Sequence, residues 1–554
     1  MGRYIILSSC LLLVILSLGS THWVANINNT GTGTLRAAVD SAQNGDTIRF
    51  QASLISSGNN TITLSSQISI TKSLYIIGIF NSSDSLFISG NSTTRIFDVQ
   101  SCDSLFMDSL LFISGRTTTS NGGAISIQDS LSVIVFRNCF FKENRAKYKG
   151  GAIYINNRPD TTLNSIIQIE NTTFYRNKSD EDAGAVYIKA NSDSLLFKNS
   201  SFEKNIASDI GGAAYLDIET RNLTLLENTF SKNEAYDTAG GIYLIIKAST
   251  FWIDSTAFLS NYGTGAGGGI RLLGEVDTMT ISRSTFSQNI AKKGGGLIVE
   301  ASTKYIDIDN SSFLSNIAQD DGGGFYLHSN CDFLNFTNST FNGNYAADSA
   351  GGAFIVIDAK KFTVLNCSIQ ANTTNGNGGG IKLIATLDTL IIENTLIKDN
   401  EANNGGGFDM KVTSDYVSFT NLDIHGNDIL RSGGGIYADL NATNLNLTNF
   451  DITENTTDYY GGNGSGILIS GDITNMINLT DFKLYKNLTE TSGVVGLQAN
   501  AKKLHVKNIN SFNNRCNNGL ANSMFIMNEI DSVFIDSCNF KKDSSAYSSN
   551  SFYI

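Results

Sequence analysis

The stretch STFSQNIAKKGGGLIVE, residues 284–300, joins a polar run to an apolar segment through three consecutive glycines. Its first half holds a Phe-x-x-Asn motif at Phe286 and Asn289, and the strand-like segment 297–299 follows the glycines. A phosphate-binding glycine loop leads into a helix, because the helix N-terminus holds the anion. A strand in that place indicates that the glycines turn the chain.

Both motifs recur in phase along the chain, with a period of 27–29 residues in every interval but one of 33. Such self-similarity is typical of a repeat architecture. The last glycine of each glycine element lies at Gly123, Gly151, Gly184, Gly212, Gly241, Gly269, Gly296, Gly324, Gly352, Gly380, Gly407 and Gly435. Phe-x-x-Asn runs from Phe141/Asn144 to Phe341/Asn344, and isoleucine replaces the phenylalanine from Ile369/Asn372 to Ile452/Asn455.

Within one unit, apolar residues alternate with polar ones in three short runs, 150–155, 166–171 and 172–174. Alternation with a period of two predicts strands. Three strands in 28 residues fit one coil of a parallel β-helix, in which each coil pairs with its neighbours. The sequence therefore predicts an all-β, single-stranded parallel β-helix of roughly 18–19 coils, a rod about 90 Å long.

Glycine is abundant, with 52 residues, whereas the chain holds a single proline, Pro159, inside the 33-residue interval. We expect that interval to extrude a loop, where proline is tolerated. The formal net charge of −12 argues against a nucleic-acid partner.

The chain divides into five predicted segments. Residues 1–21 resemble a secretory signal peptide, with Arg3 before an apolar run and small residues near Gly19 to Thr21. The rival interpretation is a lipoprotein box ending at Cys10. An N-terminal cap covers 22–50, coils without the glycine marker cover 51–120, the marked repeat covers 121–515, and 516–554 form a C-terminal coil and tail. No hydrophobic membrane span follows the signal peptide, so we expect a secreted or cell-surface product.

The cap is predicted to contain a short helix with Thr34 as its N-cap and Leu35, Ala38, Val39 and Ala42 on one face, followed by a first strand at 46–50. At the other end, 532–540 is the last predicted strand and 541–554 is a polar tail without an obvious cap.

Six cysteines follow the signal peptide, and their spacing fits no metal site and no unique disulfide pairing. Cys139 and Cys367 stand two residues before the motif Phe or Ile, a position that serine or threonine holds in most other repeats. We call this position the serine and threonine slot, and we expect both cysteines there to be buried thiols.

Three sets of residues are candidate sites. The motif asparagines predict an internal hydrogen-bonded ladder: Asn144, Asn177, Asn205, Asn233, Asn261, Asn289, Asn316 and Asn344. Five N-x-Ser/Thr sequons fall at an outward position and are open to a glycan if the host glycosylates: Asn171, Asn199, Asn310, Asn338 and Asn366. The sequons at Asn177, Asn372 and Asn455 belong to the ladder and should stay bare.

Acidic residues between the motif asparagine and the glycines form the third set: Asp209, Asp237, Asp321 and Asp348. A row of carboxylates could hold calcium, which wants several oxygens at once. Thr264 and Lys292 interrupt the row, so a solvated turn is the simpler interpretation. We predict no other cofactor.

No catalytic constellation stands out, because the four histidines share no repeat register and no nucleophile or metalloprotease motif is present. The enzyme alternative is a polysaccharide lyase or glycosidase, which needs a groove with convergent carboxylates. A fold analogy alone suggests it.

The in-phase Gly-Gly-Ala strands at 122–125, 150–153 and 351–354, with Phe-x-x-Asn, resemble the repeats of the polymorphic outer-membrane protein family. The opening GTLRAAVDSAQNGDTIRF, residues 33–50, is similar to the start of exported right-handed β-helix domains. The resemblance implies a right-handed coil and a surface-exposed adhesin that binds a receptor or glycan. Family members typically end in an autotransporter barrel, and this chain departs from that pattern because its repeat runs almost to Ile554. We therefore predict a non-enzymatic, adhesin-like protein, with the carbohydrate-active enzyme and a structural coat or spacer as alternatives.

Overall fold

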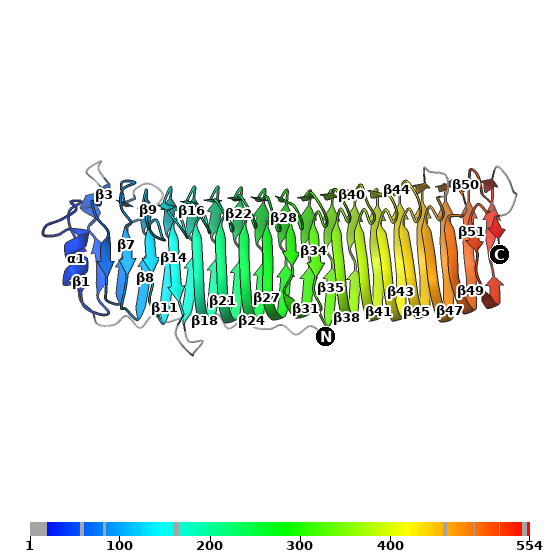
Figure 1. The fold of residues 1–554 in the computed structure, drawn as a ribbon, viewed down its shortest axis with the longest axis horizontal. Helices are drawn as coiled ribbons and strands as arrows, with labels where there is room; N and C mark the ends of the chain where they lie inside the picture. The colour runs from blue at the N-terminus through cyan, green and yellow to red at the C-terminus, as the bar shows by residue number, and fades with distance from the viewer. Residues whose placement is uncertain are drawn as a thin grey trace.

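The computed structural model describes residues 19–55, 60–80, 85–158, 165–457, 462–491, 493–519, 521–545 and 551–553. The chain winds as a right-handed parallel β-solenoid of about 18 turns with about 28 residues per turn, as the period predicts. Figure 1 shows the coils stacked in chain order along one rod, with helix α1 (Leu35–Ser41) at one end. Residues 1–18, and with them most of the predicted signal peptide, lie outside the described residues, as does Pro159.

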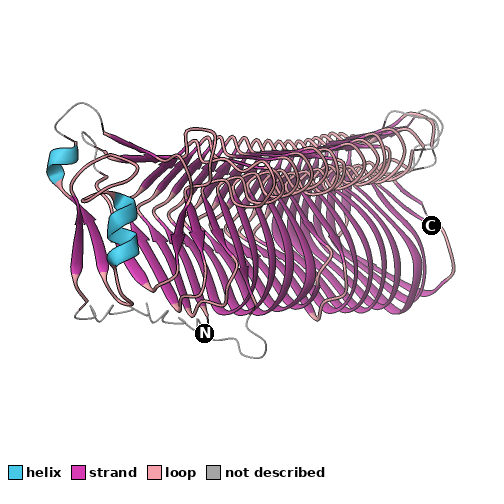
Figure 2. Cartoon of the chain, turned by 60° about the vertical axis from the view of Figure 1, so that its left-hand side comes forward, coloured by secondary structure: helices cyan, strands magenta, loops and turns pink. Residues whose placement is uncertain are grey.

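Each repeat contributes four strand positions rather than the three expected. In each coil the chain crosses a first face after the glycines and bends onto a second face. It then turns onto a third face, which carries the motif phenylalanine, and ends in a two-residue strand after the motif asparagine. Figure 2 shows the turns gathered into a ridge along one side of the molecule. Neighbouring coils pair in parallel register throughout, for example Phe202 with Phe174 and Phe230.

The separate first-face strands are β4 (Ile68–Ile70), β7 (Phe97–Val99), β10 (Ile125–Ile127), β14 (Ile153–Asn157), β30 (Leu297–Val299), β34 (Phe325–His328), β51 (Met524–Ile526) and β55 (Phe552–Tyr553). The separate second-face strands are β1 (Thr21–Val24), β2 (Thr47–Phe50), β5 (Leu74–Ile77), β8 (Ser104–Asp108), β11 (Val133–Arg137), β15 (Ile166–Glu170), β31 (Ser302–Asp309), β35 (Phe333–Thr337) and β52 (Ile530–Asp536).

In many coils the first and second faces merge into one strand, because only a bend and no turn separates them. These strands are β18 (Val186–Lys198), β21 (Ala214–Leu226), β24 (Ile242–Asp254), β27 (Ile270–Ser282) and β38 (Ala353–Leu365). In later coils the strand also takes in the third face: β41 (Ile381–Lys398), β43 (Phe408–His425), β45 (Ile436–Thr453), β47 (Ile467–Tyr485) and β49 (Val495–Phe512).

The third-face strands are β3 (Thr61–Thr63), β6 (Phe87–Ser89), β9 (Leu111–Ile113), β12 (Phe140–Lys142), β16 (Thr173–Tyr175), β19 (Ser201–Glu203), β22 (Thr229–Ser231), β25 (Ala257–Leu259), β28 (Thr285–Ser287), β32 (Ser312–Leu314), β36 (Thr340–Asn342), β39 (Ser368–Gln370) and β53 (Asn539–Lys541). The two-residue strands form a separate 15-stranded sheet: β13 (Arg145–Ala146), β17 (Lys178–Ser179), β20 (Ile206–Ala207), β23 (Glu234–Ala235), β26 (Tyr262–Gly263), β29 (Ile290–Ala291), β33 (Ile317–Ala318), β37 (Tyr345–Ala346), β40 (Thr373–Thr374), β42 (Glu401–Ala402), β44 (Asp428–Ile429), β46 (Thr456–Thr457), β48 (Leu488–Thr489), β50 (Arg515–Cys516) and β54 (Ser544–Ser545).

The glycine triplet is a corner with two separate requirements. Gly294 has a φ of 57°, a left-handed conformation that glycine adopts without strain. Gly296 has no room for a side chain, because a Cβ there would lie 2.4 Å from the carbonyl oxygen of Gly324 in the next coil. The triplet therefore turns the chain and lets the coils approach closely.

The motif phenylalanines point inward and stack on one another from coil to coil. Ring centroids of successive motif phenylalanines from Phe141 to Phe341 lie 4.6–5.0 Å apart with nearly parallel planes, and Phe112 extends the stack by one coil at 4.8 Å. That spacing matches the distance between neighbouring strands, about 4.8 Å.

The motif asparagines form a buried, continuous ladder. Asn261 Nδ2 donates to Asn289 Oδ1 in the next coil and to the Phe230 carbonyl in the previous one, both at 2.9 Å. Asn261 Oδ1 accepts from the backbone N and the Nδ2 of Asn233, at 3.1 and 2.9 Å. The same bonds link the eight predicted residues and six more: Asn372, Asn400, Asn427, Asn455, Asn487 and Asn514.

Both ends differ from the sequence-based expectation. The helix forms as predicted, with Thr34 Oγ1 accepting from Ala37 N at 3.2 Å, but strand β1 precedes it and pairs with β2. At the other end, β54 and β55 continue the coil into the segment expected to be a polar tail. Asp543 takes the next ladder position and accepts from Asn514 N at 2.8 Å.

Replacing Asn261 with alanine should lower the thermal unfolding midpoint sharply. It removes the amide that donates to the Phe230 carbonyl and to Asn289 Oδ1, and it leaves the backbone N and one Nδ2 hydrogen of Asn233 without their acceptor. Each buried group left unpaired costs about 1–3 kcal/mol. The control is Asn441→Ala, at an exposed strand position. Equal midpoints for the two variants would contradict the ladder's role.

Candidate functional site

The ladder asparagines cannot reach a ligand, because their side chains are 0–1% exposed and their amides bond within the core. Binding must therefore use the outward side chains between the corners. Four outward features are distinct: an acidic turn row, an aromatic row, an outer asparagine row and a groove.

The acidic turn row contains three of the four predicted carboxylates. Backbone hydrogen bonds run from Asp237 to Asp209 and from Asp348 to Asp320, which places these residues in one row. Gly265 and Lys292 separate the two pairs. Asp321 was wrongly assigned to this row: it lies one residue further along, pairs with Ser349, and its carboxylate lies 3.8 Å from Lys293 Nζ.

These carboxylates do not assemble a metal centre in the described part of the chain, where no three His, Cys, Asp or Glu side chains lie within reach of one ion. Burial and the neighbouring Asp182 and Asp237 raise the pKa of Asp209. Neighbouring carboxylates of the row therefore repel one another.

An aromatic row follows the first outward position of the first face. Tyr154, Tyr187, Tyr215 and Tyr243 stack with centroids 4.7–5.2 Å apart. Lys149 Nζ lies 5.0 Å from the Tyr187 ring centroid and 2.8 Å from an oxygen of Asp182. Because the rings cover one another's faces, little ring surface is left to solvent, and Tyr187 is only 5% exposed.

Asp409 occupies the same row further along, only 8% exposed, with an oxygen 3.9 Å from Lys382 Nζ. Burial raises the pKa of Asp409 to about 6, and Lys382 only partly offsets the rise.

The five predicted sequon asparagines lie exposed in left-handed turns, with φ of 46–54°. Most bond along this outer row; Asn199 Nδ2, for example, donates to Asn171 Oδ1 at 2.8 Å. Asn177, Asn372 and Asn455 are fully buried. Use of the outer sequons by a glycosylating host stays a prediction.

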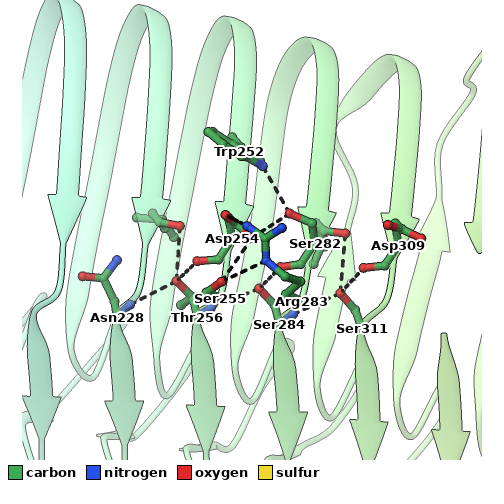
Figure 3. A network of polar contacts seen from close by, with 12 residues as sticks. Asn228, Trp252, Asp254, Ser255, Thr256, Ser282, Arg283, Ser284, Asp309 and Ser311 are labelled. Atoms are coloured by element: carbon green, nitrogen blue, oxygen red, sulfur yellow. Dashed lines mark hydrogen bonds and ion pairs between the residues drawn. The ribbon is translucent and has the colours of Figure 1, made fainter. Parts of the chain in front are cut away.

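The outer row holds Glu227, Ser255 and Arg283 in place of asparagine, and a polar network surrounds Ser255 and Arg283 (Figure 3). The Asp254 side chain is 2% exposed, accepts from Ser282 Oγ at 2.8 Å and pairs with Arg283. Trp252 Nε1 donates to Ser282 Oγ at 3.4 Å. With both oxygens engaged, Asp254 is a structural acceptor rather than a free base.

Below this network, the serine and threonine slot links successive coils. Thr256 N donates to Ser284 Oγ and Ser284 N to Ser311 Oγ, each at 3.2 Å, as Figure 3 shows. Cys139 and Cys367 occupy this slot, buried and unpaired, and the other four described cysteines are also free.

A groove with a volume of about 570 Å³ crosses the outside of the bend between the first and second faces. Its charged lining residues are Glu219, Arg221, Lys247, Glu275, Asp277, Lys304, Asp332 and Asp358. Lys247 Nζ lies 2.8 Å from Glu219 and Lys304 Nζ lies 2.6 Å from Asp277, each across one coil. Glu275 and Asp358 have no ion-pair partner among the described residues.

Cys331 also lines the groove, but it does not supply a nucleophile. Burial raises the pKa of its thiol to about 12. The reactive form of cysteine is the thiolate, which is nearly absent at neutral pH when the pKa is so high.

Sequence reasoning missed the groove, the aromatic row and the Asp254 network. The tyrosines recur in phase at the second residue of the first-face strand, so the repeat alignment contains that signal. The groove has no such signal, because it depends on where the long strands bend.

Asp409→Asn should stabilise the protein at neutral pH. The pKa of Asp409 is raised in the folded state, so the fold favours the protonated carboxyl. The contribution of this group to stability therefore falls as pH rises from its unfolded pKa, near 4, to about 6. The titration of Asp409 alone should take about 1–3 kcal/mol from the unfolding free energy of the wild type across this window. The variant should lose less, as measured by urea unfolding at pH 4, 5, 6 and 7, and identical pH profiles would refute the assignment.

Comparison with known proteins supports the fold. Residues 218–396 match the family model described as right-handed beta helix region, and residues 138–156 match the Chlamydia polymorphic membrane protein repeat. No curated protein matches the chain. No helix in the described residues is both long and apolar enough to cross a membrane.

Two solved structures of the PL6 family alginate lyase AlyGC, one of a mutant, share 11% and 9% identity with this chain. The matches cover 96% of this chain in both cases and 100% and 99% of the lyase chains, with TM-scores of 0.23 and 0.27. Such low scores carry no argument about function. The chain is therefore a right-handed parallel β-helix that contains a segment matching the chlamydial polymorphic membrane protein repeat.

Proposed function

We propose that this protein is exported and acts at a cell surface as an adhesin-like binder of a glycan or receptor, without catalysing a reaction. The observation that carries the proposal is the groove over the strand bend, which extends from Glu219 to Asp358 across successive coils. The polymorphic membrane protein repeat supports surface association.

The groove suits binding to an extended polar chain. It is open and long, and its lysines pair with carboxylates of the preceding coil. Such charges give specificity and faster association more than raw affinity. Repetition along a rigid rod also lets weak contacts add, because a second contact by a tethered ligand is intramolecular.

The second candidate is a carbohydrate-active enzyme, for which the groove offers two carboxylates without an ion-pair partner among the described residues, Glu275 and Asp358. They lie three coils apart, about 14 Å at the spacing of neighbouring strands. That is wider than the separation of the paired carboxyl groups of glycosidases, about 5–9.5 Å, so the groove favours binding over hydrolysis. A structural coat or spacer is the third, and it differs from an adhesin in having no receptor.

The test is to screen the purified full-length protein against a glycan array and intact cells. We expect saturable binding that falls about tenfold or more in the Lys247→Glu/Lys304→Glu double variant, a loss of at least 1.4 kcal/mol. Lys232→Glu, in the turn after β22 and outside the groove, should bind as the wild type does.

The same samples should be assayed for new reducing ends or unsaturated products from each bound polysaccharide. Depolymerisation that stops in Glu275→Gln would establish the enzyme and refute the non-catalytic proposal. No binding to any cell or glycan would favour the coat or spacer.

A further inference from the structure

The first residues of the described chain are tied to one buried carboxylate. Ser20 N donates to Asp46 Oδ1 at 2.7 Å, and the Ser20 carbonyl accepts from Thr47 N at 2.9 Å. The other carboxylate oxygen, Oδ2, contacts His22 Nε2 and Gln43 N, both at 2.8 Å. Only 7% of the Asp46 side chain is exposed. Both backbone groups of Ser20 are therefore fixed at the edge of the N-terminal cap.

The sequence before Ser20 fits a processing site at the same point. Ser17 and Gly19 stand three residues and one residue before the Gly19–Ser20 bond, the two positions where signal cleavage requires small side chains. Neither observation depends on the other: one is a sequence pattern, and the other is a hydrogen bond to a buried acid.

We propose that the protein is cleaved between Gly19 and Ser20, and that the new α-ammonium group of Ser20 forms an ion pair with the Asp46 carboxylate. Water is the co-reactant: hydrolysis breaks the peptide bond, leaves a carboxylate on Gly19 and gives Ser20 an amine, which takes up a proton. The proposal rests on the export part of the proposed function and goes beyond it in naming the bond and its acceptor.

Asp46 suits an ammonium partner better than it suits an amide. Hydrogen bonds from Gln43 N, His22 and Ser20 N lower the pKa of Asp46, so the group is an anion at neutral pH. An ammonium group brings a full positive charge to the position where the amide brings only a dipole. Cleavage therefore strengthens the link between strand β1 and the turn before β2.

The rival interpretation treats Ser41, His22 and Asp46 as a nucleophilic triad beside a cavity of about 780 Å³. In such triads the serine contacts Nε2 and the carboxylate contacts Nδ1. Here the contacts are reversed, with Ser41 Oγ 3.2 Å from His22 Nδ1. Ser41 Oγ also donates to the Ala37 carbonyl at 2.9 Å, within its own helix. The geometry favours Asp46 as a structural acceptor.

The experiment expresses residues 1–554 in a secreting host and determines the N-terminus of the protein in the medium by intact mass and terminal sequencing. We expect the secreted chain to begin at Ser20. A secreted chain that begins at any other residue would overturn this proposal and leave export intact. Retention in the cell with the leader attached would overturn both.

Amine labelling tests the ion pair separately. A nearby carboxylate raises the pKa of an amine by about one unit or more, so labelling of the Ser20 amine at pH 7 should be about tenfold slower than in a peptide of the same N-terminal sequence. Asp46→Asn should restore fast labelling, whereas Asp40→Asn, an exposed acid on α1, should not. Fast labelling of the wild type would refute the ion pair even if Asp46→Asn failed to fold.

Discussion

The solenoid depends on a column of amide groups sealed inside it. Between the ends of the ladder, each asparagine has its two amide donors and its acceptor engaged by the coils before and after it, which hold an asparagine at the same height. Leaving such groups unpaired in the core is costly. A coil of the wrong length would therefore lose the hydrogen bonds of its own asparagine and also those of the asparagine in the neighbouring coil. The stacked phenylalanines reinforce the register, because their separation equals the strand spacing.

This constraint explains why the repeat is strict in some places and loose in others. In Phe-x-x-Asn the first and last residues point inward, and the residue before the asparagine takes a left-handed turn, as Gln288 does with a φ of 56°. The glycine corners fix the closest approach of the backbones. Outward positions are free to vary, which is why the tyrosines, the acids and the groove charges occupy limited stretches of the rod. Any binding function must therefore come from the outward-facing residues that line up from coil to coil.

The fold and the ladder were predictable because two motifs recur in phase, and a shared period fixes which residues stack. The alignment of the turn residues between the asparagine and the glycines was not predictable. The length of this turn varies by one residue between coils, so the sequence does not show which acid of one coil lies next to which acid of the following coil. Asp320 rather than Asp321 continues the row for this reason. The ladder position at Asp543 was hidden because Phe-x-x-Asp, from Phe540, replaces the motif there, and the Asp543 carboxylate accepts from Asn514 N as an asparagine oxygen would. The first strand was missed because it pairs only after the helix reverses the chain.

Deleting one whole coil tests the central claim most directly. Removing residues 262–289, which are 28 residues, joins Asn261 to Ile290 and leaves every remaining ladder and corner position in register. Small-angle scattering and circular dichroism should show the same strand content in a rod shorter by about 4.8 Å. Removing only residues 262–275 should abolish the cooperative unfolding transition. If the whole-coil deletion is as damaging as the half-coil deletion, or if both are tolerated, the ladder does not set the register of this fold.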